Sequence, residues 1–156
     1  MNPKKVSESA IDNQLYPLFV NDLNINNTAF GGRVLEIADK LAAAVAMRHS
    51  NRVCVTFLVD SVKFLAPAVQ GECLIFKAAV NRVWNSSMEV GVKVMAENFQ
   101  TGAKRHVVSA YFTFVAIDES RRPVPVAPVM PEMNDEKRRY QKAEDRRRRR
   151  LEDLRR

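Results

Sequence analysis

The chain has 156 residues, 46% of them hydrophobic, which lets one ordinary domain bury a core without disulfides or metals as staples. Its net charge is +7, but residues 135–156 contain 11 Lys and Arg against 6 Asp and Glu. The remainder therefore has 14 basic against 12 acidic residues and is close to neutral. A body that binds nucleic acid over its whole surface is not indicated, and we do not expect a nucleic-acid partner.

The N-terminus contains Lys4 and Lys5 without a following apolar segment, and no stretch approaches the roughly 18 to 20 uncharged residues of a membrane span. We expect a cytoplasmic protein with no membrane span. Cys54 and Cys73 lie in apolar runs and are too few for a disulfide scaffold, so we expect both to fill core positions.

Residues 1–13 are polar and predict a flexible N-terminus. The apolar run 15–20 follows, and Pro17 limits any strand there to a sheet edge. Residues 21–28 contain four asparagines, which favour turns because the side chain bonds the local backbone. This segment predicts a structured loop.

Apolar residues at helical spacing predict a helix over 33–48. Its second half, 41–47, has no polar residue, so we expect protein on all sides of it. After Arg52 the apolar period changes to two, which predicts strands within 53–64, 74–80, 88–94 and 107–117. Short turn-rich connections favour antiparallel hairpins, so the fold class is α+β.

Prolines at 123, 125, 128 and 131 predict a linker or a surface strap. A charged helix should follow, with Asn134 as its N-cap. Its exposed i,i+4 pairs would be Glu144–Arg148, Asp145–Arg149 and Glu152–Arg156. The expected organisation is a flexible segment 1–13, a domain 14–120, a Pro-rich linker 121–133 and a basic helix 134–156.

Sequence motifs for phosphate-binding loops, dinucleotide sites, zinc sites and serine hydrolase elbows are absent. His49 lies ten residues after Asp39, about 15 Å along a helix, so the two do not form a dyad. We expect His49 to be a cation at the helix C-terminus and His106 to lie at a strand edge. No metal site is predicted.

Asp39 is the one carboxylate within the otherwise apolar helix face. It either points to an exposed edge with Glu36 and Lys40, or acts as a general base or nucleophile at the mouth of a pocket. Gly31 and Gly32 support the second interpretation, because glycines at a helix start allow a ligand close to unpaired backbone N–H groups. Such donors suit an oxyanion.

These residues resemble the cytosolic acyl-CoA thioester hydrolases of the hotdog fold, including the brain-type enzymes and their short bacterial relatives. The resemblance runs from about Asn21 to Pro125. It rests on Asp22-Leu-Asn24, Phe30-Gly-Gly32, the helix with Asp39, Arg48-His49, Val55-Thr56, Val59-Asp-Ser-Val-Lys-Phe64, Ser87-Met-Glu-Val90, Thr101-Gly102 and Phe112–Glu119.

The resemblance implies an antiparallel sheet wrapped around one long helix, with acyl-CoA as substrate and no separate cofactor. It also implies a homodimer, often a trimer of dimers, in which Asp39 of one subunit meets Asn24 of the other. Asp39 would activate water or attack the thioester, the Gly32 N–H would stabilise the oxyanion, and Asn24 would position water or the carbonyl. The chain has Ala38-Asp39-Lys40 where the family usually has Met-Asp-Glu, so Lys40 could change the pKa of Asp39 or the acyl entrance.

The expected substrate contacts are Gly31, Thr56, Lys63, Ser86, Ser87, Lys104 and Arg105. A hairpin turn and solvated charges explain the serines and the basic residues equally well. The arginine run 146–150 has three interpretations: a solvated helix, a phosphate clamp for CoA on a neighbouring subunit, or a contact to RNA or an anionic membrane. The rival function is therefore a non-catalytic hotdog oligomer whose tail binds RNA or an anionic surface.

Overall fold

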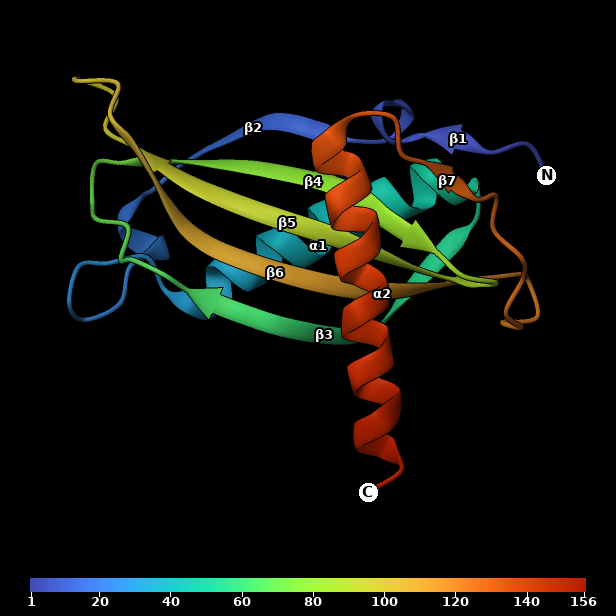
Figure 1. Cartoon of the computed structure of the whole chain (residues 1–156). Helices are drawn as coiled ribbons and strands as arrows, with labels where there is room; N and C mark the ends of the chain where they lie inside the picture. Colours follow the sequence, from blue (N-terminus) through green and yellow to red (C-terminus); the bar gives the residue numbers. More distant parts are fainter.

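A five-stranded antiparallel sheet curves around one long helix in the computed structural model, which describes residues 1–156 (Figure 1). The order across the sheet is β2 (Ile11–Pro17), β4 (Cys73–Val83), β5 (Ser87–Glu97), β6 (Lys104–Ile117) and β3 (Val53–Phe64). Strands β2 and β3 are therefore the edges, as Pro17 in β2 requires. Helix α1 (Gly31–Ser50) lies along the concave face, which confirms the expected α+β architecture.

Helix α1 is longer than predicted by two residues at each end. It ends at Asn51, whose left-handed backbone (φ 56°) lets its N–H bond the carbonyl of Met47 at 2.8 Å. Ala42 and Ala46 are fully buried against the sheet, whereas Ala44 and Met47 are exposed. The expectation that the whole run 41–47 is enclosed is therefore wrong for a single chain, because the sheet covers only one stripe of the helix.

The core lies between α1 and alternate residues of the three central strands. Phe76, Phe112 and Phe114 are at most 1% exposed, and the rings of Phe112 and Phe114 stack with centroids 6.3 Å apart. Cys54 and Cys73 are both free and partly buried, and burial raises the pKa of the Cys54 thiol. Neither α1 nor the C-terminal helix combines the length and apolar character that a membrane crossing needs.

The N-terminal residues meet the proline-rich segment beside the end of α1. Residues 1–13, expected to be flexible, include β1 (Lys4–Lys5), a 3₁₀ turn η1 (Val6–Glu8) with buried Val6, and the start of β2. Strand β1 pairs in parallel with β7 (Val129–Met130), so the proline-rich segment is a strap with a buried side. The polar composition of residues 1–13 does not predict this pairing, because it joins residues more than a hundred positions apart.

His49 is covered by this strap and is 0% exposed. Its Nε2 lies 2.8 Å from the carbonyl oxygen of Ala127. Burial lowers the pKa of His49, although the bond to Ala127 opposes the shift. The prediction of a cation at the helix C-terminus is wrong, because the strap excludes the water that would stabilise the charge.

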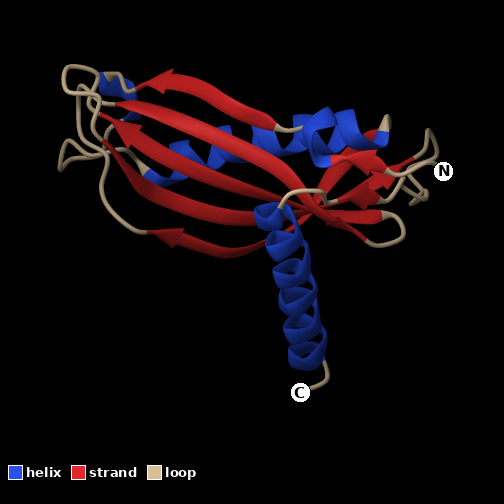
Figure 2. Cartoon of the chain, turned by 45° about the horizontal axis from the view of Figure 1, so that its top comes forward, coloured by secondary structure: helices blue, strands red, loops and turns tan.

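Helix α2 (Asn134–Leu154) lies across the convex face of the sheet and extends past the edge strand β3 (Figures 1 and 2). Met133 occupies the N-cap position predicted for Asn134. Arg146 and Arg150 pair with Glu89 and Asp60 of the sheet instead of standing in solvent. None of the predicted i,i+4 ion pairs forms: Glu144 bonds Trp84 and Arg82, and Asp145 pairs with Arg148 instead of Arg149.

Candidate active site

Asp22 anchors the loop that precedes α1. Its carboxylate is 3% exposed and accepts hydrogen bonds from the Tyr16 hydroxyl at 2.8 Å and the Phe19 N–H at 2.9 Å. The Arg33 Nε lies 3.2 Å from the same carboxylate. The bond to Asp22 raises the pKa of Tyr16. This buried carboxylate ties the loop to β2 and to α1. The sequence motif alone does not reveal this structural role.

Asn24 organises the same loop through its side chain. Its Oδ1 accepts from the N–H of Asn26 at 2.9 Å and of Thr28 at 3.2 Å, and its Nδ2 donates to Thr28 Oγ1 at 2.9 Å. Asn27 adopts a left-handed backbone with φ 59°, which Asn tolerates better than most residues. The predicted structured loop is present, and Asn24 holds its shape.

The start of α1 leaves two backbone donors outside the helix. The first helical bonds run from the N–H groups of Arg33 and Val34 to the carbonyl of Phe30, at 3.0 and 3.1 Å. The N–H groups of Gly31 and Gly32 precede them and have no bond within the chain. A Cβ at Gly32 would lie 2.9 Å from the Phe30 ring, so a larger residue would displace this aromatic side chain.

Asp39 lies two turns further along α1, opposite the edge strand β3. The Thr56 hydroxyl donates to its Oδ1 at 2.9 Å, and no other side chain bonds the carboxylate. Lys40 instead pairs with Glu36 at 3.2 Å, on the solvent side of the helix. Asp39 is therefore not part of that exposed charge pair, and one of its oxygens remains available to a ligand or a water molecule.

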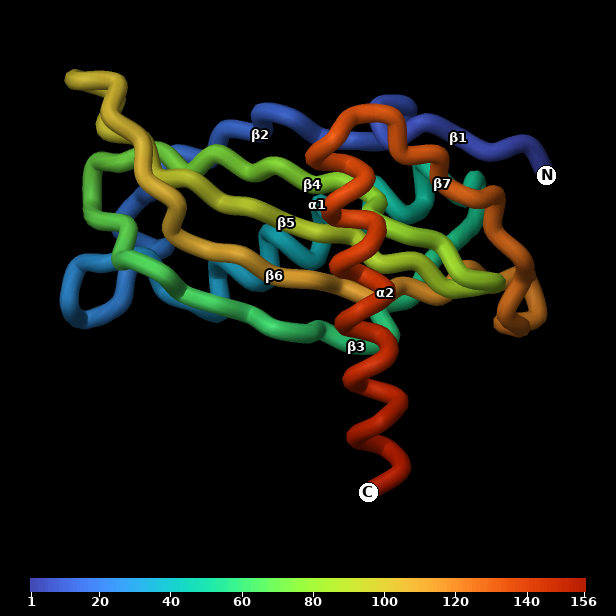
Figure 3. Tube along the Cα trace, viewed as in Figure 1, coloured from blue at the N-terminus to red at the C-terminus, as the bar shows by residue number.

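Asp39 and the glycine pair do not converge within one chain. Seven residues separate Gly32 from Asp39, which is about 10 Å along a helix at about 1.5 Å per residue. A thioester carbonyl cannot contact both groups at this separation. Asn24 belongs to the loop that precedes the helix. This loop lies at the Gly32 end of α1 (Figure 3).

Two cavities adjoin the loop and the start of α1. One of about 440 Å³ is lined mainly by apolar side chains between the helix start and the end of β3, including Val34, Phe64 and Leu65. Gly31 contributes its backbone to this wall. The other, of about 560 Å³, is more open and lies over Leu23, Asn24 and Phe30. An apolar cavity beside unpaired N–H groups suits an acyl chain with its carbonyl at the mouth.

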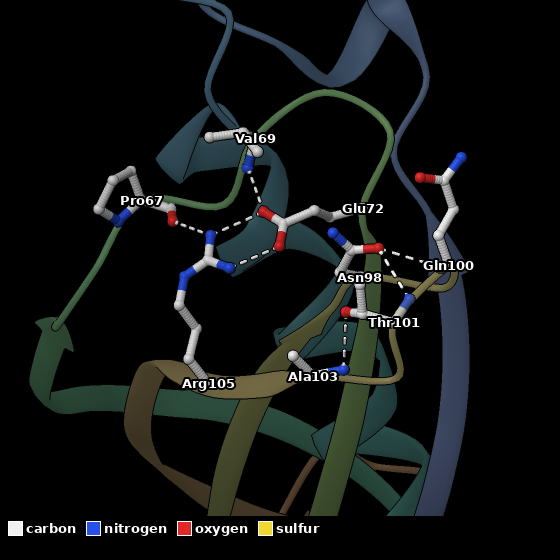
Figure 4. Close-up of polar contacts among 8 residues, drawn as sticks. All are labelled: Pro67, Val69, Glu72, Asn98, Gln100, Thr101, Ala103 and Arg105. Atoms are coloured by element: carbon white, nitrogen blue, oxygen red, sulfur yellow. Dashed lines mark hydrogen bonds and ion pairs between the residues drawn. The ribbon is translucent and has the colours of Figure 1, made fainter.

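The basic residues predicted to contact the substrate differ in their availability. Arg105 forms a bidentate pair with Glu72, at 2.5 and 2.6 Å, and also donates to the Pro67 carbonyl (Figure 4). Glu72 is buried, and its bonds with Arg105 lower its pKa. Lys104 lies 3.5 Å from Glu97, whereas exposed Lys63 has no partner within the chain. Arg105 thus joins two segments of the fold.

Ser86 and Ser87 form the turn between β4 and β5. Ser87 pairs with Val115 and Glu97 with Lys104, so this turn and Lys104 lie at opposite ends of β5. The 11 residues of β5 span more than about 30 Å at the rise of an extended strand. A single subunit therefore does not bring the two serines near the basic residues.

His106 lies in β6, where its Nε2 is 2.8 Å from the Ser109 hydroxyl oxygen. No group of three His, Cys, Asp or Glu side chains could hold a metal ion.

Known proteins resemble this chain in both sequence and fold. The Thioesterase superfamily model matches residues 26–103. The uncharacterized acyl-CoA thioester hydrolase YkhA of Bacillus subtilis is 39% identical over 132 residues, covering 85% of this chain and 75% of that protein. A solved apo-hexameric acyl-CoA thioesterase superimposes with a TM-score of 0.95 at 36% identity, over 99% of this chain and 98% of that chain.

The acyl-CoA hydrolase of Staphylococcus aureus, solved with butyryl coenzyme A, coenzyme A and coenzyme A disulfide, superimposes with a TM-score of 0.91 at 35% identity, over 97% of this chain and 92% of that chain. Variants of it with an Asp, a Thr or an Asn replaced by Ala have also been solved. The Asn and Asp are 15 positions apart and the Asp and Thr 17 apart, the spacings of Asn24, Asp39 and Thr56 here. From this agreement of sequence and fold we conclude that the chain belongs to the hotdog-fold thioesterase superfamily.

Proposed function

We propose that this protein is an acyl-CoA thioesterase, which hydrolyses acyl-CoA to a free fatty acid and CoA. The observation that carries the proposal is the Asp39 carboxylate, oriented by the Thr56 hydroxyl and otherwise unpaired. The matching Asn, Asp and Thr spacings in the S. aureus acyl-CoA hydrolase support it.

In the proposed reaction, a water oxygen attacks the thioester carbonyl carbon while Asp39 accepts the water proton. The carbonyl oxygen becomes an oxyanion, which accepts a hydrogen bond from the Gly32 N–H. The carbon–sulfur bond then breaks, and the thiolate of CoA leaves and takes up a proton. Direct attack by Asp39 would pass through an acyl anhydride instead. Label found in Asp39 after a single turnover in ¹⁸O-water identifies this route, because water that opens the anhydride at the Asp39 carbonyl leaves its oxygen on that side chain.

The site is proposed to form between two subunits. Gly32 and Asp39 are about 10 Å apart in one chain, so their convergence requires Asn24 and Gly32 from one subunit and Asp39 from another. Exposed Ala44 and Met47 on α1 and the free edge of β3 offer a surface for such pairing. A two-fold homodimer would contain two equivalent sites, and three dimers would form a hexamer.

This pairing also bears on the CoA contacts. When two β3 strands pair antiparallel about a two-fold axis, the Ser86–Ser87 end of one subunit approaches the Lys63 and Lys104 end of the other. We propose that Lys63 contacts a CoA phosphate and that the serine turn contacts CoA from the second subunit, with Lys104 in support. Arg105, already paired with Glu72, would shape the site without binding phosphate.

A panel of acyl-CoA esters of different chain lengths, with detection of the released thiol, tests the activity. We expect turnover with at least one ester, undiminished after dialysis against a chelator, because every reacting group proposed is a protein group or water. Absence of thiol release across the panel would refute the function. We also propose a cytoplasmic location, which fractionation of expressing cells would test.

Complementation tests the shared site. Asn24→Ala and Asp39→Ala each remove one component, so each homodimer should be nearly inactive. A mixed dimer retains one intact site, made of Asn24 from one subunit and Asp39 from the other. Co-expressed variants should therefore recover about a quarter of wild-type activity, since about half of the dimers are mixed and each has one of two sites. No recovery in verified mixed dimers would place both residues in the same subunit's site.

A further inference from the structure

The end of α2 is only partly covered in the single chain. Its last ion pair to the sheet joins Arg150 to Asp60 of β3 at 2.9 Å, and the helix then continues past this edge strand (Figures 1 and 2). Leu151 and Leu154, three residues apart and thus on neighbouring parts of the helix surface, are 45% and 83% exposed. The helix therefore presents apolar side chains beyond the sheet.

Edge strand β3 presents a complementary apolar strip. Val53, Val55 and Phe57 are 62%, 45% and 69% exposed. Val55 pairs with Val115 of β6, and Val115 and Phe57 line a groove of about 560 Å³ together with Leu151 and Leu154. The strip thus lies on the convex side with α2, whereas Thr56 points to Asp39 on the concave side.

We propose that the last turn of α2, with Leu151 and Leu154, packs on the convex face of a second copy of this chain. The inference rests on the subunit pairing in the proposed function. Pairing of β3 with β3 about a two-fold axis continues the sheet under the protruding helix. The first surface it meets is the same apolar strip of β3, so each copy supplies both the helix end and its docking surface.

The anchoring of α2 makes this arrangement specific. Arg146 is bonded to buried Glu89 at 2.6 Å and Arg150 to Asp60, so the sheet sets the direction in which the helix leaves its edge. Arg147 stacks over Trp84 with 4.7 Å to the ring centroid. These three arginines face their own sheet and are not available to a nucleic acid or membrane surface. Beyond these anchored arginines, Leu151 and Leu154 are exposed at the helix end.

Subunit exchange measures the contribution of the helix end. Full-length protein labelled with donor or acceptor dyes is mixed, and energy transfer reports exchange. Leu151→Ser with Leu154→Ser should exchange at least about tenfold faster than wild type, because two apolar side chains leave the interface. Arg148→Ser with Arg149→Ser, changed at neighbouring exposed positions of the same helix, should exchange like wild type. Equal exchange by both double variants, each with intact helical circular dichroism, would overturn the proposal.

Photo-cross-linking locates the contact. A photoreactive residue at position 154 should give a covalent dimer, with peptides mapping to β3 of the other subunit, whereas one at exposed Gln100 should give little. A protein that sediments as a dimer yet cross-links only within its own chain, or to another molecule, would refute the docking. Such a result would leave thioester hydrolysis, measured separately, unaffected. A wild-type protein that sediments as a monomer would refute both the docking and the shared site.

Discussion

Two carboxylates on opposite faces of the sheet have contrasting surroundings. Glu89 on the convex side is 0% exposed and accepts hydrogen bonds from Arg146 at 2.6 and 3.1 Å and from Asn81 at 3.0 Å. Asp39 on the concave side is only partly buried and accepts one side-chain bond, from Thr56. Both residues are Asp or Glu in an otherwise apolar pattern, so the sequence alone gives them similar prominence.

The difference shows how a carboxylate is committed to structure or left available for chemistry. An ionised carboxylate has about four acceptor positions. Those of Glu89 are used largely within the protein, and a cation neutralises it. Burial by itself would lower the pKa of Arg146, but the hydrogen bonds and charge of Glu89 raise it above its usual value. Asp39 retains acceptor positions for a water molecule or substrate, which is what a general base requires.

The largest effect is expected when the buried pair is broken. Arg146→Ala leaves Glu89 without its cation inside the protein, which should lower the free energy of unfolding by about 3 to 5 kcal/mol. Chemical denaturation measures this change, and Arg148→Ala, at an exposed position of the same helix, should change stability by less than about 0.5 kcal/mol. Equal stability of the two variants would show that the pair does not anchor α2.

The opposite behaviour is expected at Asp39. Asp39→Ala should reduce kcat at least about a hundredfold, since general-base assistance typically contributes this much, while the melting temperature and the oligomer persist. Glu36→Ala, on the exposed side of the same helix, is the matched control and should retain its turnover. Near wild-type turnover of the Asp39 variant would end its assignment as base or nucleophile.

Local sequence patterns predicted the concave side, which holds Asp39, better than the convex side, which holds Glu89. The helix period, the Asn-rich loop, the glycine pair and the single carboxylate Asp39 all lie within short stretches of chain. Together with the family resemblance, they predicted the α+β fold and assigned Asn24, Gly32 and Asp39 to the site. The helix bounds were short by two residues because end geometry, such as the left-handed Asn51, depends on backbone detail.

The convex side depends on contacts that no local pattern encodes. Arg146 and Glu89 are 57 positions apart, and the arginine run by itself indicates a solvated helix as readily as a docked one. His49 was misassigned for the same reason, since its cover comes from Ala127, 78 positions away. Ser86 and Lys104 lie at opposite ends of the sheet, and this separation likewise follows from strand order and length rather than from residue type.

A smaller effect should follow removal of the hydroxyl that orients Asp39. Thr56→Val keeps the shape of the side chain but loses the 2.9 Å bond, and a net hydrogen bond of about 1 kcal/mol corresponds to an about fivefold lower kcat. Thr56→Ser should restore most of the rate. A positioning role predicts that kcat falls while KM stays nearly constant, so a change in KM alone would instead assign Thr56 to substrate binding.

The smallest effect concerns a group remote from both carboxylates. Burial lowers the pKa of His49 below its unfolded value of about 6.5, so the unfolded chain binds a proton more readily than the folded one as pH falls through that value. Stability should therefore decrease as the pH falls from about 7.5 to about 5.5, by at most about 1.4 kcal/mol, the limit for a group that stays neutral in the folded state. The lowered pKa of Glu72 acts only in more acidic solution, below about 4.5, and does not obscure this window. His49→Gln keeps an N–H donor for the Ala127 carbonyl but does not titrate, so this variant should lose less stability over the same pH interval. A decline as steep as that of wild type would assign the pH dependence to other groups.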